Sequence, residues 1–321
     1  MPQYCGSCWA HGSSSFDFNN NSNNNLLIKV STSRSLLVLV VDVSPVAWGE
    51  RSVLRQAQDK QRHAAGKRSM GPATLEELLN SIRIYDGAYA TLQRSVCIVV
   101  IGVASNTTAL LFPRKNALEH LFRTGDITID WTYFYQQLTD GVAELVARAA
   151  AAAAITTTTA TSSSTGDAAM ASGVSQAFCI VNRFLVDMQR GVTALTNDSA
   201  GLFRKDDQGI VGMMSAGDAL PKKSSSVMDW SPRIMVFQAS PDRSNDYNSM
   251  MNAVFAAVKH SIVIDACFLT SGSKSAPKSS SFLEQACDRT GGIYLSPSGA
   301  AQVDVALTEV LLCVFLAPLS A

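Results

Sequence analysis

The feature that most constrains the fold is a run of apolar residues that ends in an acid, Leu36-Leu-Val-Leu-Val-Val-Asp42. Six consecutive apolar residues leave no polar face, so this run fits a strand that is buried on both sides, as in the centre of a parallel sheet. Similar apolar runs follow at 96–102, 233–238 and 261–269. Between them lie segments with helical periodicity, and this alternation predicts an α/β fold with a doubly wound, mostly parallel sheet and helices on both faces.

The remaining elements are shorter or less regular. The segment at 107–112 predicts a short extra strand that stops at Pro113. The segment at 291–295 predicts a fifth main strand, which begins with the Gly291-Gly292 turn. The strongest helical pattern places Val174, Phe178 and Val181 on one face. Helices are predicted at 49–64, 73–90, 133–148, 174–188, 247–259, 282–288 and 300–316.

The composition varies along the chain in a way that predicts its domain organisation. Residues 1–35 are rich in Asn and Ser, which compete with regular secondary structure, so we expect a disordered tail. Residues 36–317 form the predicted domain. Low-complexity Ala, Thr and Ser near 149–172, and Gly, Ser, Asp and Lys near 195–231, predict two surface insertions.

Charge and hydropathy exclude several classes of protein. The 26 Lys and Arg balance the 26 Asp and Glu, which argues against strong direct nucleic-acid binding, because phosphate contacts need a cationic surplus. No run approaches the roughly 20 apolar residues of a membrane span, and the N-terminus has no signal-peptide pattern, so no membrane partner is expected. Seven cysteines, mostly within apolar stretches, favour free thiols over a disulfide framework.

The candidate site lies where the first strand ends, since parallel sheets bind ligands beyond the carboxyl ends of their strands. Asp42 and Ser44 offer oxygens there. This loop resembles the Asp-x-Ser-x-Ser metal-binding motif of von Willebrand factor A domains, which a later Thr and a strand-end Asp complete. Val46 stands at the third motif position, Ser240 lies near the strand-end position, and Asp242 comes two residues late. We therefore expect a degenerate site without a metal, in which Asp42 and Ser44 cap a helix or hold the loop.

Several blocks in the same order resemble the general transcription factor IIH (TFIIH) subunit 3 family, a small von Willebrand A-like core subunit. The first block includes Pro45 and the Trp48-Gly49 pair. The resemblance spans about residues 36–316, and the other blocks lie at 111–113, 177–183, 233–242, 247–259, 262–267 and 283–295.

This resemblance implies a nuclear, non-enzymatic subunit that supports transcription initiation and nucleotide excision repair. Its implied partners are the larger von Willebrand A and zinc-binding subunit of TFIIH and the other core subunits. The family continues into a cysteine-rich zinc module, whereas here Cys313 stands alone and the sequence ends at Ala321. We therefore expect this chain to lack that module and to bind no cofactor.

Two alternatives come from other classes of function. Residues 3–12 resemble the nucleophile segment of papain-like peptidases, most of all cathepsin X, with Cys8 as the nucleophile and His11 nearby. A papain-like peptidase also needs a base His and an orienting Asn on a second domain, and no matching context surrounds the other histidines.

Cys5, Cys8 and His11 supply three potential zinc ligands where a structural zinc takes four. The other alternative is a metal-dependent von Willebrand A ligand-binding domain.

Overall fold

The computed structural model describes most of the predicted domain. The described residues are 34–64, 72–92, 96–124, 129–156, 167–201, 230–269, 277–297 and 307–316. Within these ranges no helix combines the length and the apolar character that a membrane span requires.

A six-stranded sheet forms the centre of the domain, in the order β3-β2-β1-β4-β5-β6. The pairs between β1 and β2, β1 and β4, β4 and β5, and β5 and β6 are parallel, whereas β3 runs antiparallel to β2. The predicted doubly wound, mostly parallel sheet is confirmed. The strands are β1 (Arg34–Asp42), β2 (Val96–Val103), β3 (Thr108–Phe112), β4 (Trp230–Gln238), β5 (Val263–Phe268) and β6 (Tyr294–Leu295).

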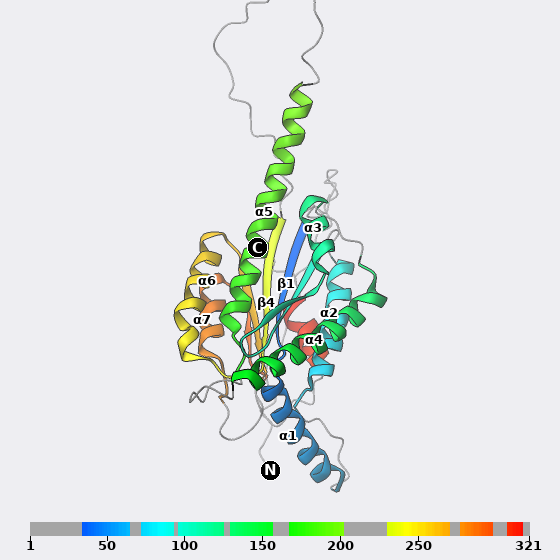
Figure 1. Cartoon of the computed structure of the whole chain (residues 1–321), viewed down its shortest axis with the longest axis vertical. Coiled ribbons are helices and arrows are strands. Elements are labelled where there is room, and N and C mark those ends of the chain that lie inside the picture. The colour runs from blue at the N-terminus through cyan, green and yellow to red at the C-terminus, as the bar shows by residue number, and fades with distance from the viewer. Residues whose placement is uncertain are drawn as a thin grey trace, which may run out of the picture. The chain divides into compact units, whose positions relative to one another are not determined.

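Helices cover both faces of this sheet (Figure 1). They are α1 (Pro45–Ala64), α2 (Leu75–Leu92), α3 (Lys115–Thr124), α4 (Trp131–Thr156), α5 (Met170–Gly201), α6 (Tyr247–Lys259), α7 (Ser281–Thr290) and α8 (Leu307–Phe315), and a short 3-10 turn, η1 (Ser244–Asp246), precedes α6.

The alternation of side chains along β1 explains why the sheet needs two helical layers. Leu36, Val38 and Val40 pack in a core with residues of α3, α5, α6 and α7. Leu37 and Leu39 point the other way and pack with residues of α1, α2, α4 and α8. Each of these side chains is fully buried, which contributes about 1.5–3 kcal/mol relative to leaving it in water.

The Gly291-Gly292 turn lies before β6, as predicted. The local backbone requires glycine at both positions. Gly291 ends α7 in the left-handed conformation, with φ of 71°. A Cβ added to Gly292 would lie 1.9 Å from the carbonyl oxygen of Ile264, so this position does not tolerate a side chain.

Several predicted boundaries need correction. Strand β1 begins at Arg34, so residues 34 and 35 belong to the domain rather than to the tail. Helix α3 was not predicted. Helix α4 continues through the Ala tract to Thr156, with residues 150–152 exposed, and Ala168 and Met170 are buried in the core, so the edges of the 149–172 range belong to a helix and to the core rather than to an insertion.

The second predicted insertion also has narrower bounds. Helix α5 extends to Gly201, and β4 begins at Trp230. The tail up to residue 33 and the central parts of both predicted insertions, 157–166 and 202–229, lie outside the described residues.

An uncompensated carboxylate lies in this core. Asp86 of α2 is fully buried, and neither of its carboxylate oxygens has a hydrogen-bond partner among the residues that the structure describes. Asp265 is equally buried but pairs with Arg233. Burial raises the pKa of Asp86 well above its ordinary value.

We predict that Asp86→Asn stabilises the protein at neutral pH. The unfolded Asp ionises at about pH 4, whereas the folded one resists ionisation, so wild-type stability falls as the pH rises from about 4 through the folded pKa. The variant lacks this dependence, and its free energy of unfolding at pH 7 should exceed that of the wild type by on the order of 1–3 kcal/mol. Urea unfolding at a series of pH values measures the difference.

Asp140→Asn is the matched control, because Asp140 is exposed on α4. It should leave both the stability and its pH dependence nearly unchanged. Equal or lower stability of Asp86→Asn at pH 7 would contradict the prediction.

Candidate functional site

The carboxylate of Asp42 lies at the carboxyl end of β1 and is fully buried. Its Oδ1 accepts a hydrogen bond from the backbone N–H of Ser44 at 2.8 Å. Its Oδ2 accepts from the backbone N–H groups of Ala239 and Ser240 at 3.0 and 2.6 Å. One side chain therefore joins the loop after β1 to the loop after β4.

The sheet topology places these loops together. Strands β1 and β4 are parallel neighbours, and Val41 pairs with Phe237 in their register, so both strands end at the same edge. The backbone of Asp42 is also held, because its carbonyl oxygen accepts from the indole N–H of Trp48 at 2.8 Å. The N–H of Val43 donates to the carbonyl oxygen of Val103 at 2.8 Å, which ties the same loop to β2.

Two opposing effects act on the ionisation of Asp42. Burial raises its pKa above the ordinary value and is the larger effect, while hydrogen bonds from Ser44, Ala239 and Ser240 act in the opposite direction. These donors compensate part of the cost of removing a carboxylate from water.

A buried cation, Arg51, lies close enough to interact with Asp42. Burial lowers the pKa of Arg51 to about 10, and the charge of Asp42 is one of the interactions that oppose this. Arg51 donates to the carbonyl oxygens of Leu269 and Ala73 at 2.8 and 3.1 Å. It therefore connects α1 with the loop after β5 and the segment before α2.

Ser44 and Val46, the other two residues of the motif, lie at the start of α1. Ser44 is buried, and its carbonyl oxygen accepts from the N–H of Trp48 at 3.2 Å in the first turn of the helix. Val46 is 49% exposed and has no side-chain oxygen. The motif thus holds a loop and starts a helix.

Asp242 caps a different helix. Its Oδ1 accepts from the amide Nε2 of Gln238 at 3.0 Å and from the hydroxyl of Ser280 at 2.5 Å. Its Oδ2 accepts from the backbone N–H of Phe282 at 3.2 Å and from the hydroxyl of Ser281 at 3.3 Å. Because Oδ2 accepts a backbone N–H of the first turn, Asp242 supports the N-terminus of α7 beside the N-cap residue, Ser280.

Three of the five predicted site residues therefore meet, and the other two lie apart from them and from each other. Asp42, Ser44 and Ser240 meet through backbone N–H groups, whereas Asp242 contacts α7 and Val46 faces the solvent. Sequence reasoning missed Arg51, Gln238 and Ser280. The helix predicted at 282–288 matches α7, but nothing local in the sequence links the start of that helix to Asp242.

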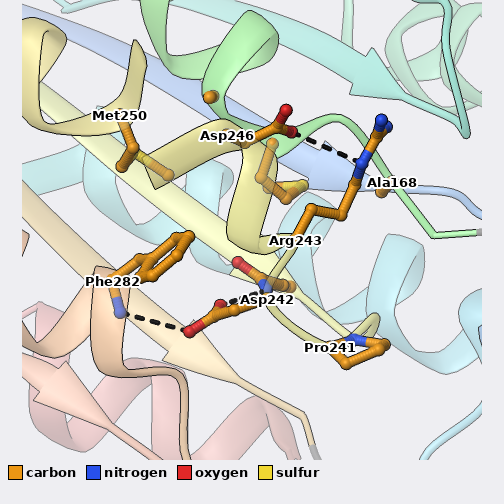
Figure 2. A pocket seen from close by; sticks show the side chains of 10 residues that line it. Ala168, Pro241, Asp242, Arg243, Asp246, Met250 and Phe282 are labelled. Carbon is orange, nitrogen blue, oxygen red and sulfur yellow. Dashed lines mark hydrogen bonds and ion pairs between the residues drawn. The ribbon is translucent and has the colours of Figure 1, made fainter. Parts of the chain in front are cut away.

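A hollow lies beside this edge, between the turn after β4 and the beginning of α5 (Figure 2). Pro241, Asp242, Met250 and Phe282 are among the residues that line it. Its volume of about 10 Å³ is close to the space that one water molecule needs, so it does not accommodate an organic ligand.

Arg243 closes one side of the hollow. Its Nε lies 3.6 Å from a carboxylate oxygen of Asp246, and its Nη1 donates to the carbonyl oxygen of Ser105 at 2.9 Å. The second contact ties the turn after β4 to the loop between β2 and β3. The guanidinium group of Arg243 therefore forms its ion pair and its hydrogen bond with residues of the same domain.

The donor set around Asp42 does not fit Mg²⁺, which prefers oxygen ligands in near-octahedral geometry. Val46 contributes no oxygen, and both carboxylate oxygens of Asp42 already accept backbone N–H groups. Within the described ranges, no group of three or more His, Cys, Asp or Glu side chains is arranged to hold a metal ion. Cys8 and His11 of the predicted peptidase segment lie outside the described residues.

Comparisons with known proteins agree on one family. The family model for transcription factor Tfb4 matches residues 34–320. General transcription factor IIH subunit 3 of Dictyostelium discoideum is 44% identical over 85 residues, which are 26% of this chain and 20% of that protein. The TFIIH subunit TFB4 of Debaryomyces hansenii is 24% identical over 294 residues, covering 85% of this chain and 69% of the relative.

A solved structure extends the likeness to the fold. The TFIIH p34 N-terminal domain matches with a TM-score of 0.52 and 18% identity, over 88% of this chain and 97% of that domain. The matches to the first relatives, from D. discoideum, Arabidopsis thaliana and Schizosaccharomyces pombe, span about a fifth of the length of each.

We predict that Asp42→Asn destabilises the domain. The amide has one acceptor oxygen in place of two, so at least one of the three backbone N–H groups would face an NH₂ group. A buried donor without an acceptor costs about 1–3 kcal/mol, and urea unfolding should show a loss of this size. Val46→Ser is the control and should change stability by less than about 0.5 kcal/mol, because Val46 is exposed. Wild-type stability in Asp42→Asn would show that the carboxylate does not hold the two loops.

Proposed function

Because this chain belongs to the transcription factor Tfb4 family, we propose that it is a non-catalytic structural subunit of TFIIH. In this role it supports transcription initiation by RNA polymerase II and nucleotide excision repair through contacts with other proteins. The relatives from A. thaliana and D. hansenii are named as subunits of a general transcription and DNA repair factor, and the relative from D. discoideum is named as a subunit of general transcription factor IIH.

One observation carries the non-catalytic part of the proposal. At the edge where doubly wound sheets bind ligands, the charged side chains Asp42, Arg51 and Asp242 are engaged with the backbone and with neighbouring side chains. The buried atoms there without a hydrogen-bond partner among the described residues are Ser240 Oγ and Gln238 Oε1. Asp42 binds the loop after β4, Asp242 binds α7, and Arg51 binds the loop after β5. This arrangement supports a rigid scaffold, since it leaves few groups to orient a substrate or ligate a cation.

The proposal extends to partners and location. The partners are the larger von Willebrand A and zinc-binding subunit of TFIIH and other core subunits, and the site of action is the nucleus. The even balance of 26 basic and 26 acidic residues supports binding through protein surfaces rather than through direct contact with nucleic acid. We propose that the domain acts without magnesium or another cofactor.

Affinity capture tests the proposal. The tagged chain should recover identified TFIIH core subunits from nuclear extract in near-stoichiometric amounts, as quantified by mass spectrometry. A Cys8→Ala variant should recover the same subunits, because the proposal gives the thiol no role. The purified chain should cleave no peptide substrate of papain-like enzymes.

Two results would contradict the proposal. One is capture that contains no TFIIH subunit, although the folded chain is present in the extract. The other is peptide hydrolysis that the Cys8→Ala variant abolishes, which would revive the peptidase alternative.

A further inference from the structure

Helix α8 is held to the rest of the domain by few contacts. It lies next to α2, and α8 is the red helix in Figure 1. Of its nine residues only Leu311 and Phe315 are buried, whereas α2 buries seven residues and α6 buries five. We propose that α8 is a strap, a segment that opens from the domain as a unit while the sheet stays folded.

Most apolar side chains of α8 are covered only in part. Leu307, Val310, Leu312 and Val314 are half-buried, and Cys313 is exposed. Hydrophobic stabilisation grows with the apolar area that is removed from water, so partial cover gives only part of the stabilisation. A segment with few buried apolar contacts has a low free energy of local opening, and α8 fits this description.

The polar contacts of α8 lie at its two ends. Near its start, Oγ1 of Thr308 and Oγ of Ser81 in α2 are 2.8 Å apart. At its end, the carbonyl oxygen of Phe315 accepts from the hydroxyl of Tyr85 at 3.4 Å and from Nη1 of Arg233 at 3.5 Å. Both of these distances exceed the usual range for a hydrogen bond, so the C-terminal end of α8 is held loosely.

The docked position of α8 also leaves a charged group incompletely compensated. Arg233 of β4 is 9% exposed and pairs with the buried Asp265 of β5. Its Nη2 is buried and has no hydrogen-bond partner among the described residues. A buried donor without an acceptor costs free energy that hydration restores. Because this guanidinium group contacts the end of α8, departure of the helix admits water to it and favours the open state.

The opening has a defined extent. Leu311 and Phe315 leave the core cluster that also contains Tyr85 and Met235. The pairing of β1 with β4 and the contacts of Asp42 do not involve α8, so they remain in the open state. Helix α8 is thereby a reversible cover for an apolar surface of the domain.

Native-state hydrogen exchange of the full chain, followed by mass spectrometry at increasing urea below the unfolding transition, tests the strap. Peptides of α8 should exchange at least tenfold faster than peptides of β1 and β4. Their exchange should also depend less on urea, because opening one helix exposes less surface than unfolding the domain. Exchange of α8 at the same rate and with the same urea dependence as β1 and β4 would overturn the proposal.

Variants of single hydroxyl groups sharpen the test. Thr308→Val should raise the exchange of α8 about threefold to tenfold, and Tyr85→Phe should raise it about threefold, since each removes a bond that exists only while α8 is docked. Tyr89→Phe is the matched control, because its hydroxyl lies 2.6 Å from Oγ of Ser35 whether α8 is docked or open. It should speed exchange in β1 but leave α8 unchanged. Equal effects of Tyr85→Phe and Tyr89→Phe on α8 would show that the helix opens only with the whole domain, which contradicts the strap.

Discussion

The carboxylate of Asp42 is the interaction on which the carboxyl edge of this sheet depends. It is fully buried, and it accepts hydrogen bonds from three backbone N–H groups in two loops that are almost 200 residues apart. Hydrogen bonds to a charged group are stronger than those between neutral groups, and here they offset part of the desolvation of the carboxylate. The two central strands, β1 and β4, are thereby joined where their regular pairing ends.

Further contacts extend from this point to neighbouring elements. Gln238 and Asp242 connect the loop after β4 to α7, and Arg243 connects it to the loop between β2 and β3. In enzymes with doubly wound sheets, the same edge is where substrates and cofactors bind. In this domain the charged groups of that edge, Asp42, Asp242 and Arg243, instead hold its own loops, which agrees with membership of the transcription factor Tfb4 family.

The fold was largely predictable because buried parallel strands have a distinctive pattern. The apolar runs located β1, β2, β4 and β5, and the predicted helix at 247–259 matches α6. Helix α3 was missed because it is short, although Leu118, Leu121 and Phe122 stand at helical spacing and face the core. The second edge of the 149–172 range was misread because small residues occur both in loose insertions and, as at Ala171, where a helix packs on a sheet; the first edge was misread because its exposed Ala tract continues helix α4.

The candidate site was predictable only in part. The sequence identified Asp42 and Ser44, and the expectation that they hold the loop agrees with the contacts of Asp42. The role of Asp242 depends on a helix that begins 39 residues later, at Ser281, and local sequence carries no signal for such a contact. Asp242 therefore looked like a displaced metal ligand, whereas the structure shows it bound to Ser280, the N-cap of α7, and to the N–H of Phe282.

The central claim is that the carboxylate of Asp42 binds the protein's own backbone and is not available to a cation. Titration of the isotope-labelled domain with magnesium, followed by amide NMR signals, tests it most directly. Our account predicts that the amide signals of Ser44, Ala239 and Ser240 keep their positions at millimolar Mg²⁺. Saturable shifts of these three signals, absent in Asp42→Asn, would show that the edge still binds a metal.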